Sequence, residues 1–190
     1  SLADLRRAHD ASLKGFAVWK AMPAAKRCDI LRRGADLMNR DKERIAAILT
    51  MENGKPLSEA LAEIGFSIEA LQWCAEEGKR AYGRIIPSRL ENQRQIVLKE
   101  PVGPVAAFAA WNFPASNVIR KIGGALGAGC SLILKASEET PGTAVAIARC
   151  LEEAGLPDGV LQLVFGVPDE ISAYLLASPG IRKVSLTGST

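Results

Sequence analysis

Apolar residues recur every three or four positions through the first ninety residues, which is the spacing of helices with one buried face. The pattern predicts a helix near the start, a second after Pro23 that ends near Asn53-Gly54, and a third that Pro56 opens. We expect these apolar faces to be core positions: Leu2, Leu5, Leu13, Phe16 and Trp19 in the first helix, Ile30, Leu31, Leu37, Met38, Ile45, Ile48 and Leu49 in the second, and Leu57, Leu61, Ile64, Ile68 and Leu71 in the third.

The helical spacing stops at residues 83–87, and residues 94–100 then form a candidate extended strand before Pro101. Such a strand could be an edge element that pairs with another subunit. We therefore divide the chain into a helical part at residues 1–90, an extended strand and candidate oligomerisation element at 91–101, and a partial Rossmann-like NAD-binding domain at 102–190.

From Val102 onward, short apolar runs alternate with helical patterns. The runs predict strands at 105–109, 131–134, 160–165 and 182–186. The intervening stretches predict helices at 119–126, around Leu175-Leu176, and from Pro141, with Thr140 as N-cap, to Gly155. Strands that alternate with helices favour an α/β fold, in which a helical layer precedes a parallel sheet with crossover helices.

Polar or small residues follow each of the four predicted strands. Ligands of a doubly wound sheet bind outside the carboxyl ends of its strands, so these residues are candidates for a shared site. Each has a structural alternative, because Asn forms turns, Lys ends surface strands, and Gly-Ser caps helices. Together they favour a site for a phosphate-bearing cofactor. They are Asn112 after the first strand, Lys135 and Glu138 after the second, Gly166 after the third, and Thr187, Gly188, Ser189 and Thr190 after the fourth.

Composition and charge argue against several classes of protein. Hydrophobic residues make up 48% and charged residues 24% of the chain, as in an ordinary globular protein. The net charge is +3 and the basic pairs are short, so we expect no nucleic-acid partner. No apolar run approaches the roughly 20 residues of a membrane span, so we expect no membrane association. We predict a cytoplasmic protein without a metal site, because the cysteines form no CxxC pair and only His9 could join them: Cys28, Cys74, Cys130 and Cys150.

The glycine-rich segment 123–129 does not follow a predicted strand in the register of a dinucleotide fingerprint. We interpret it as a close helix–strand packing segment and a turn. The adjacent Cys130 precedes an apolar run and has no His nearby in the sequence, so we expect a buried, inert thiol.

Four motifs occur along the chain in an order that is specific enough to indicate a family. Residues 135–141, 154–160 and 186–190, together with Trp111-Asn112-Phe113-Pro114, resemble the ordered motifs of the aldehyde dehydrogenase superfamily. The resemblance extends back through residues 52–57 and 75–80, and so covers essentially the whole chain. The chain is especially similar to succinate-semialdehyde dehydrogenases, in which an Arg-Lys pair follows the first motif, as Arg120-Lys121 does here.

The resemblance implies a role for each candidate residue. Asn112 would donate its side-chain amide to the oxyanion of a thiohemiacetal. Arg120, eight residues later on the following helix, would bind the distal carboxylate of a semialdehyde in a bidentate fork. Lys135 and Glu138 would hold the adenosine ribose, and Glu138 would favour NAD over NADP by repelling a 2′-phosphate. The other cofactor-binding residues would be Phe108 and Ala109 through their backbone, Trp111 beside the nicotinamide, Gly166 on the adenine side, Ser189 at the pyrophosphate, and Ser137, Thr187 and Gly188.

The chain departs from the family pattern at Ala110 and Ala136, where the family often has Pro. The general-base Glu and the nucleophilic Cys of the family lie beyond Thr190, so we expect an amino-terminal fragment that is inactive alone and part of a homo-oligomer when full length. The expected full-length activity is NAD(P)-dependent oxidation of an aldehyde, such as succinic semialdehyde, to its acid. The alternatives are a non-catalytic nucleotide-binding or assembly module, and an acylating enzyme that uses coenzyme A.

Overall fold

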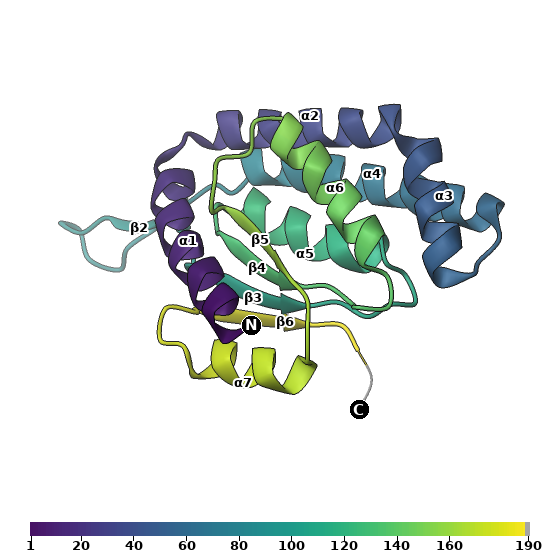
Figure 1. The fold of residues 1–190 in the computed structure, drawn as a ribbon. Coiled ribbons are helices and arrows are strands. Elements are labelled where there is room, and N and C mark those ends of the chain that lie inside the picture. Colours follow the sequence, from purple (N-terminus) through teal and green to yellow (C-terminus); the bar gives the residue numbers. More distant parts are fainter. Residues whose placement is uncertain (189–190) are drawn as a thin grey trace.

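The structure, a computed structural model, describes residues 1–188, and its centre is a four-stranded parallel sheet with helices on both faces (Figure 1). The helices are α1 (Leu2–Ala21), α2 (Ala24–Arg40), α3 (Lys42–Asn53), α4 (Leu57–Lys79), α5 (Ser116–Gly127), α6 (Pro141–Glu153) and α7 (Pro168–Ala177). The strands are β1 (Arg84–Ile86), β2 (Gln95–Val97), β3 (Val105–Phe108), β4 (Leu132–Lys135), β5 (Leu161–Val164) and β6 (Lys183–Leu186). The predicted α/β fold is confirmed.

The strands of the parallel sheet lie in the order β5-β4-β3-β6. In chain order these are the third, second, first and fourth strands, as in half of a doubly wound nucleotide-binding sheet. The carboxyl ends of β3 and β6 therefore flank the switch point at which such sheets bind ligands. The register pairs Phe108 with both Lys135 and Leu186, and Lys135 with Val164, so the four strand ends form one rim.

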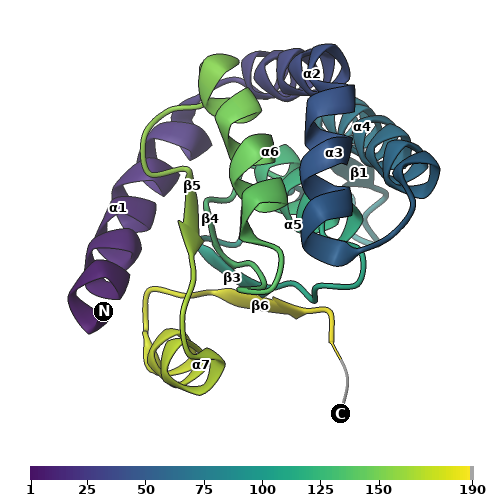
Figure 2. The same ribbon diagram turned by 45° about the vertical axis from the view of Figure 1, so that its right-hand side comes forward.

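Alternate residues of the central strands enter two separate cores. Val105 and Leu134 face the larger core, which α5, α6 and the amino-terminal helices complete. Ala106 and Ile133 face a smaller core under α7. Figure 2 shows α7 on that second face and α1 along the β5 side of the sheet. Because β3 and β4 are covered on both faces, their residues are apolar almost without interruption, as is usual for parallel strands.

The amino-terminal helices pack directly on the helices of the sheet. α4 lies against α2 and α5, and α6 lies against α2 and α3. The single helix predicted between Pro23 and Gly54 is wrong, since Asp41 separates α2 from α3 with φ −96° and ψ 10°. The Asp41 carboxylate binds Arg40 and Arg44 at 2.9 and 2.7 Å and holds this bend on the surface.

The buried face of α1 differs from its predicted stripe, because Leu2 and Leu13 are exposed. A Cβ on Gly15 would lie 2.2 Å from the carbonyl carbon of Gly159, so only a small residue lets α1 approach the segment before β5. Ser12 also donates to the hydroxyl of Ser131 at the start of β4 over 2.9 Å. The helix therefore buries mostly small side chains, which the spacing of large apolar residues could not reveal: Leu5, Ala8, Ser12, Gly15 and Trp19.

The glycine-rich segment packs against a helix rather than against a strand, which corrects our interpretation. A Cβ on Gly123 would lie 2.8 Å from Cys74 Sγ, and one on Gly127 would lie 2.9 Å from the Cys74 carbonyl oxygen. These glycines let α5 approach α4 closely. Gly129, with φ 84°, forms the turn that the sequence predicted.

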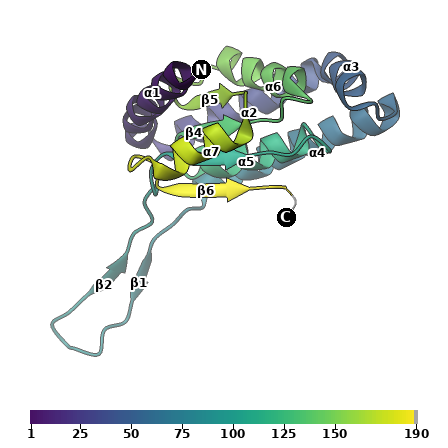
Figure 3. The ribbon, with the colours of Figure 1, turned by 60° about the horizontal axis from the view of Figure 1, so that its bottom comes forward.

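Strands β1 and β2 form an antiparallel hairpin that extends away from the sheet (Figure 3). Only Gln95–Val97 of the predicted strand at 94–100 is paired, and its partner β1 lies in the segment predicted only as a break. The assigned boundary at residue 90 falls between the two strands of this hairpin. Ile85 is 80% exposed and Ile96 is 64% exposed, so the hairpin presents apolar side chains to its surroundings.

Candidate functional site

The rim formed by the four strand ends brings most of the predicted site residues together. Ala109 N–H donates to the Lys135 carbonyl over 3.1 Å, and Thr187 N–H donates to the Phe108 carbonyl over 3.0 Å. These bonds extend the ladder beyond the strands and tie the ends of β3, β4 and β6 to one another. The Ala109 N–H is thus occupied, whereas the Phe108 carbonyl oxygen has a second lone pair with which it could accept from a ligand.

Asn112 lies in the exposed loop between β3 and α5. Its Oδ1 accepts a hydrogen bond from Asn117 Nδ2 over 3.2 Å, while its NH₂ group donates to no residue in the described part of the chain. The flanking rings of Trp111 and Phe113 are also exposed. An amide NH₂ held in this way, beside a sheet switch point, can donate to negative charge that develops on a bound molecule.

Lys135 and Glu138 form an ion pair at the end of β4. The Lys135 side chain is buried, whereas that of Glu138 is 43% exposed and open to a ligand. The hydrogen bond from Lys135 holds the pKa of Glu138 below its ordinary value, so the carboxylate is ionised at neutral pH. A carboxylate acceptor beside an ammonium donor fits a ribose diol, because hydroxyl groups can donate to the one and accept from the other.

Three other predicted residues lie along the rim, and one of them has a structural contact through its side chain. The buried Ser137 hydroxyl accepts from the Glu139 N–H over 3.3 Å, so it stabilises the turn between β4 and α6. Thr187 and Gly188 follow β6 at the switch point, on the other side of it from the Asn112 loop. Ser189, and Thr190 after it, lie outside the described residues.

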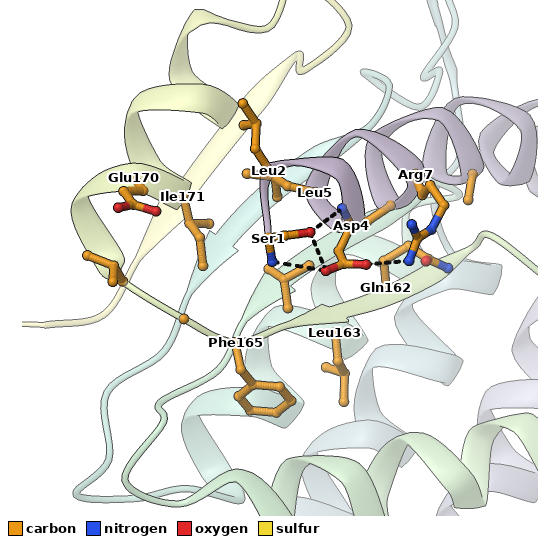
Figure 4. A pocket seen from close by; sticks show the side chains of 15 residues that line it. Ser1, Leu2, Asp4, Leu5, Arg7, Gln162, Leu163, Phe165, Glu170 and Ile171 are labelled. Atoms are coloured by element: carbon orange, nitrogen blue, oxygen red, sulfur yellow. Dashed lines mark hydrogen bonds and ion pairs between the residues drawn. The ribbon is translucent and has the colours of Figure 1, made fainter.

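Gly166 lines a cavity of about 600 Å³ between the end of β5, the start of α7 and the start of α1. Its φ of 135° is one that other residues rarely adopt. Figure 4 shows Phe165 and Ile171 on the wall of this cavity and the carboxylate of Asp4 between Ser1 and Arg7. Asn112 does not line this cavity, which belongs to the β5 side of the rim.

Arg120 lies exposed on α5 and lines a second cavity, of about 350 Å³, under α5 and β6. Lys121, Lys183 and Glu100 also line it, whereas Asn112 does not. No carboxylate within residues 1–188 pairs with Arg120. Lys121 donates to Ser185 Oγ over 2.9 Å, and burial together with the charge of Arg120 lowers its pKa.

The cysteine thiols are poor candidates for a nucleophile. Burial raises the pKa of Cys28, Cys74 and Cys150, which disfavours the reactive thiolate. Cys130 is buried at the start of β4, as predicted. Within the described chain no three His, Cys, Asp or Glu side chains gather as metal ligands would, and no helix there is long and apolar enough to cross a membrane.

Comparison with known proteins identifies the family to which a chain with this arrangement belongs. The profile of the aldehyde dehydrogenase family matches residues 1–190. The chain belongs to the aldehyde dehydrogenase family. Its fold superimposes on a crystal structure of an aldehyde dehydrogenase from Brucella melitensis biovar abortus 2308 with a TM-score of 0.98 and 44% identity, over 100% of this chain and 39% of that one. The predicted family and fold are thereby confirmed.

Two curated relatives illustrate the range of the family. The chain is 50% identical over 189 residues to the 4-(hydroxymethyl)benzenesulfonate dehydrogenase TsaD1 of Comamonas testosteroni, and this match covers 100% of the chain and 40% of the relative. It is 42% identical over 187 residues to the succinate-semialdehyde dehydrogenase [NADP(+)] GabD of Escherichia coli, covering 98% of the chain and 39% of the relative. The chain thus spans about 40% of the length of these aldehyde dehydrogenases.

We did not predict three residues whose side chains bind the backbone on either side of the Asn112 side chain: Asn53, Lys55 and Glu63. Asn53 and Lys55 lie in a segment that carried the family resemblance, but we assigned them no role. Glu63 lies on the buried face of α4, between Ala60 and Ser67. A carboxylate among buried positions of a helix requires compensation, and this was the signal that could have found it.

Proposed function

We propose that this chain supplies the oxyanion donor and part of the cofactor site of an NAD(P)-dependent aldehyde dehydrogenase that oxidises an aldehyde to a carboxylic acid. One observation carries the proposal: the NH₂ group of Asn112, which has no partner among residues 1–188, lies at the switch-point end of β3, and the Lys135–Glu138 pair lies at the end of the adjacent β4. By the full-length enzyme we mean a polypeptide of the relatives' length that carries these residues.

The chain's own groups orient the reactants and stabilise charge. The Asn112 amide donates to the substrate oxygen as negative charge develops on it. Lys135 and Glu138 would bind the ribose hydroxyls of NAD, Trp111 would line the nicotinamide region, and we assign Ser189, outside the described residues, to the pyrophosphate. NAD would supply the acceptor for the hydride. We expect the nucleophilic Cys and the general-base Glu from parts of the full-length enzyme outside these residues, so that this chain alone is inactive.

We infer NAD as the preferred cofactor, with NADP second. The Glu138 carboxylate is ionised and partly exposed, so a ribose 2′-phosphate beside it would meet a like charge. The name of the Escherichia coli relative specifies NADP(+), so cofactor choice differs within the family and must be argued from this residue.

The proposed substrate is a short aldehyde with a distal carboxylate, such as succinic semialdehyde. Arg120 supports this class because its guanidinium is exposed, unpaired among the described residues, and on the wall of a cavity that Lys121 and Lys183 also line. The names of the two curated relatives refer to a carboxylate and to a benzenesulfonate. A sulfonated aldehyde is therefore the second candidate, because a guanidinium binds either anion.

A homo-oligomer is proposed for the full-length enzyme. The β1–β2 hairpin exposes the apolar side chains of Ile85 and Ile96 and leaves the outer backbone groups of two short strands unpaired. A second copy of the chain could cover both. Loss of oligomerisation on Ile96→Lys, measured by light scattering, would support this assignment, and an unchanged mass would contradict it.

The test of the proposed activity is NAD reduction by the full-length enzyme with succinic semialdehyde. Asn112→Ala should lower kcat by about 100- to 1,000-fold, as the loss of an oxyanion donor does elsewhere. Asn39→Ala on the exposed side of α2 is the matched control and should have no effect. Binding of NAD without turnover would favour the non-catalytic alternative, and turnover that requires coenzyme A would favour the acylating one.

A further inference from the structure

The central part of the Asn112 loop, residues 111–113, is not held by burial of its side chains. Trp111, Asn112 and Phe113 are all exposed, and α5 begins only at Ser116. An exposed loop of this kind would sample several conformations unless other groups fixed its backbone. An oxyanion donor gains most of its effect from being positioned before the reaction, so whatever fixes this loop bears on catalysis.

The backbone of the loop is fixed at both ends from the α3–α4 region. Asn53 Nδ2 donates to the Trp111 carbonyl over 3.0 Å, and Lys55 Nζ donates to the Asn112 carbonyl over 3.2 Å. At the other end, Glu63 Oε1 accepts from two N–H groups at the start of α5, over 2.9 Å from Ala115 and 3.1 Å from Ser116. The backbone from Asn112 to Ser116 is therefore bound by a cation at one end and by a carboxylate at the other.

Lys55 and Glu63 also bind each other. The Lys55 Nζ to Glu63 Oε2 distance is 2.6 Å, and their side chains are only 11% and 3% exposed. The ammonium lies 4.3 Å from the centre of the Phe113 ring as well. Each buried charge is thus compensated, since one carboxylate oxygen faces the ammonium and the other faces the positive amino-terminal end of α5.

Stability alone is a weak reason for such a pair. The desolvation of two buried charges offsets much of their attraction, and two packed apolar residues are often equally stable. What an apolar pair cannot do is donate to the Asn112 carbonyl and accept from the Ala115 and Ser116 N–H groups. The directional contacts, rather than the burial, distinguish Lys55 and Glu63 from an ordinary core pair.

We propose that the buried Lys55–Glu63 pair is a positioning device that holds the Asn112 amide in place for oxyanion stabilisation. Neither residue touches the reacting atoms, so both are positioning residues. This inference rests on the proposed function of Asn112 and adds the part of the fold through which that function depends on α4. A purely structural pair would affect folding and cofactor binding as much as it affects kcat.

The test is a double-mutant cycle in the full-length enzyme. Lys55→Met should lower kcat by about 10- to 100-fold, less than complete loss of the donor, with the dissociation constant for NAD changed less than twofold. In an Asn112→Ala background the same change should lower kcat less than twofold further, because the group it positions is gone. Lys55→Arg should recover most of the activity, since it restores a cation beside Glu63.

A second variant keeps the test decisive if Lys55→Met does not fold. Glu63→Gln retains an acceptor for the Ala115 and Ser116 N–H groups and removes only the charge opposite Lys55. We expect about a 10-fold lower kcat, again with little further effect in the Asn112→Ala background. Glu59→Gln, four residues earlier on α4 and exposed, is the matched control and should match the wild type.

Three outcomes separate the two proposals. If Lys55→Met and Glu63→Gln lower kcat by the same factor with and without Asn112, the pair does not act through Asn112 and the inference is overturned. The same conclusion follows if neither variant lowers kcat. If instead the wild type reduces no NAD(P), or Asn112→Ala is as active as the wild type, the proposed function itself fails before any change at Lys55 is considered.

Discussion

Asn117 Nδ2 donates a hydrogen bond to Asn112 Oδ1 over 3.2 Å. Asn117 is 8% exposed on the first turn of α5, and its Nδ2 also lies 3.3 Å from the Ala110 carbonyl oxygen. A side-chain amide has one oxygen and one NH₂ group, so a donor that engages the oxygen leaves the NH₂ group pointing elsewhere. Asn117 thus sets which end of the Asn112 amide is available to a ligand.

The Asn117→Asp variant should reverse that choice in the full-length enzyme. A carboxylate can only accept, so Asn112 would turn its NH₂ group toward it and present its oxygen to the substrate. We expect kcat to fall by about 100-fold or more, as on loss of the donor. Asn117→Ala removes the donor to Asn112 Oδ1 and puts no competing acceptor in its place. It should lower kcat by only about 5-fold, the equivalent of one neutral hydrogen bond of about 1 kcal/mol.

Steady-state kinetics across pH distinguish orientation from misfolding. The activity of Asn117→Asp relative to the wild type should rise as the pH falls toward the pKa of the new carboxyl group, because the protonated acid can donate again. A ratio that is constant with pH, or a larger loss for Asn117→Ala than for Asn117→Asp, would contradict the proposed orientation.

The Glu138→Ser variant should shift cofactor choice. Removal of the carboxylate eliminates its repulsion of a 2′-phosphate, while Lys135 remains beside the site as a cation. We expect the kcat/KM ratio of NADP to NAD to rise by about 10-fold. Glu139→Ser changes the net charge equally at the next position and is exposed, so it serves as the control. An unchanged ratio in Glu138→Ser would remove the argument for NAD.

The Lys135–Glu138 pair also predicts a pH dependence of stability. The pKa of Glu138 is lowered in the folded chain, so its contribution is fully present above its ordinary value of 4.5 and is lost as the pH falls through the lower folded value. Glu138→Gln should therefore lower the free energy of unfolding at pH 6.5 by about 0.5 kcal/mol, a small value because Glu138 is partly exposed. At a pH below the folded value, where the carboxyl group is protonated in both states, the difference should vanish.

Urea unfolding of the chain at the two pH values, with Glu139→Gln as control, measures this difference. High salt should reduce the pH 6.5 difference, since exposed charges are screened. An equal effect of Glu138→Gln at both pH values would show that the carboxylate contributes through packing and not through its ionic contact with Lys135.

The centre of the sheet could be predicted from the sequence because β3 and β4 are buried on both faces. Runs such as 132–134 are then apolar throughout, and small residues or Lys135 mark their ends. The bend at Asp41 could not be predicted, because apolar residues keep helical spacing across it. Strand β1 was missed for the opposite reason, since all three of its residues are exposed and no burial pattern marks it.

The rim of the site could also be predicted, because parallel strands align their carboxyl ends regardless of the residues that come after them. The supports of the Asn112 loop did not follow. Lys55 and Glu63 are eight positions apart, and each binds a loop more than fifty residues later in the chain. Contacts of that sequence separation depend on how α4 packs against α5, which no local pattern encodes.

Arg120 decides the proposed substrate class, and two features of its surroundings sharpen the prediction. It is exposed and pairs with no carboxylate in the described chain, yet Lys121 and Lys183 line the same cavity and could bind an anion in its place. Glu100 also lines this cavity and would oppose an anion there. A variant of Arg120 must therefore be compared with one of Lys121.

The Arg120→Leu variant of the full-length enzyme should lose kcat/KM selectively. We expect about a 10- to 100-fold decrease for succinic semialdehyde, the range for loss of a charged hydrogen bond, and less than a twofold decrease for butanal, which lacks the carboxylate. A sulfonated aldehyde of the same length should show the same decrease in kcat/KM as succinic semialdehyde if the site recognises negative charge alone. A selective decrease in kcat/KM for the charged aldehyde in Lys121→Leu, without one in Arg120→Leu, would assign the anion site to Lys121. Equal losses for charged and neutral aldehydes in Arg120→Leu would make Arg120 structural and leave the carboxylate preference without physical support.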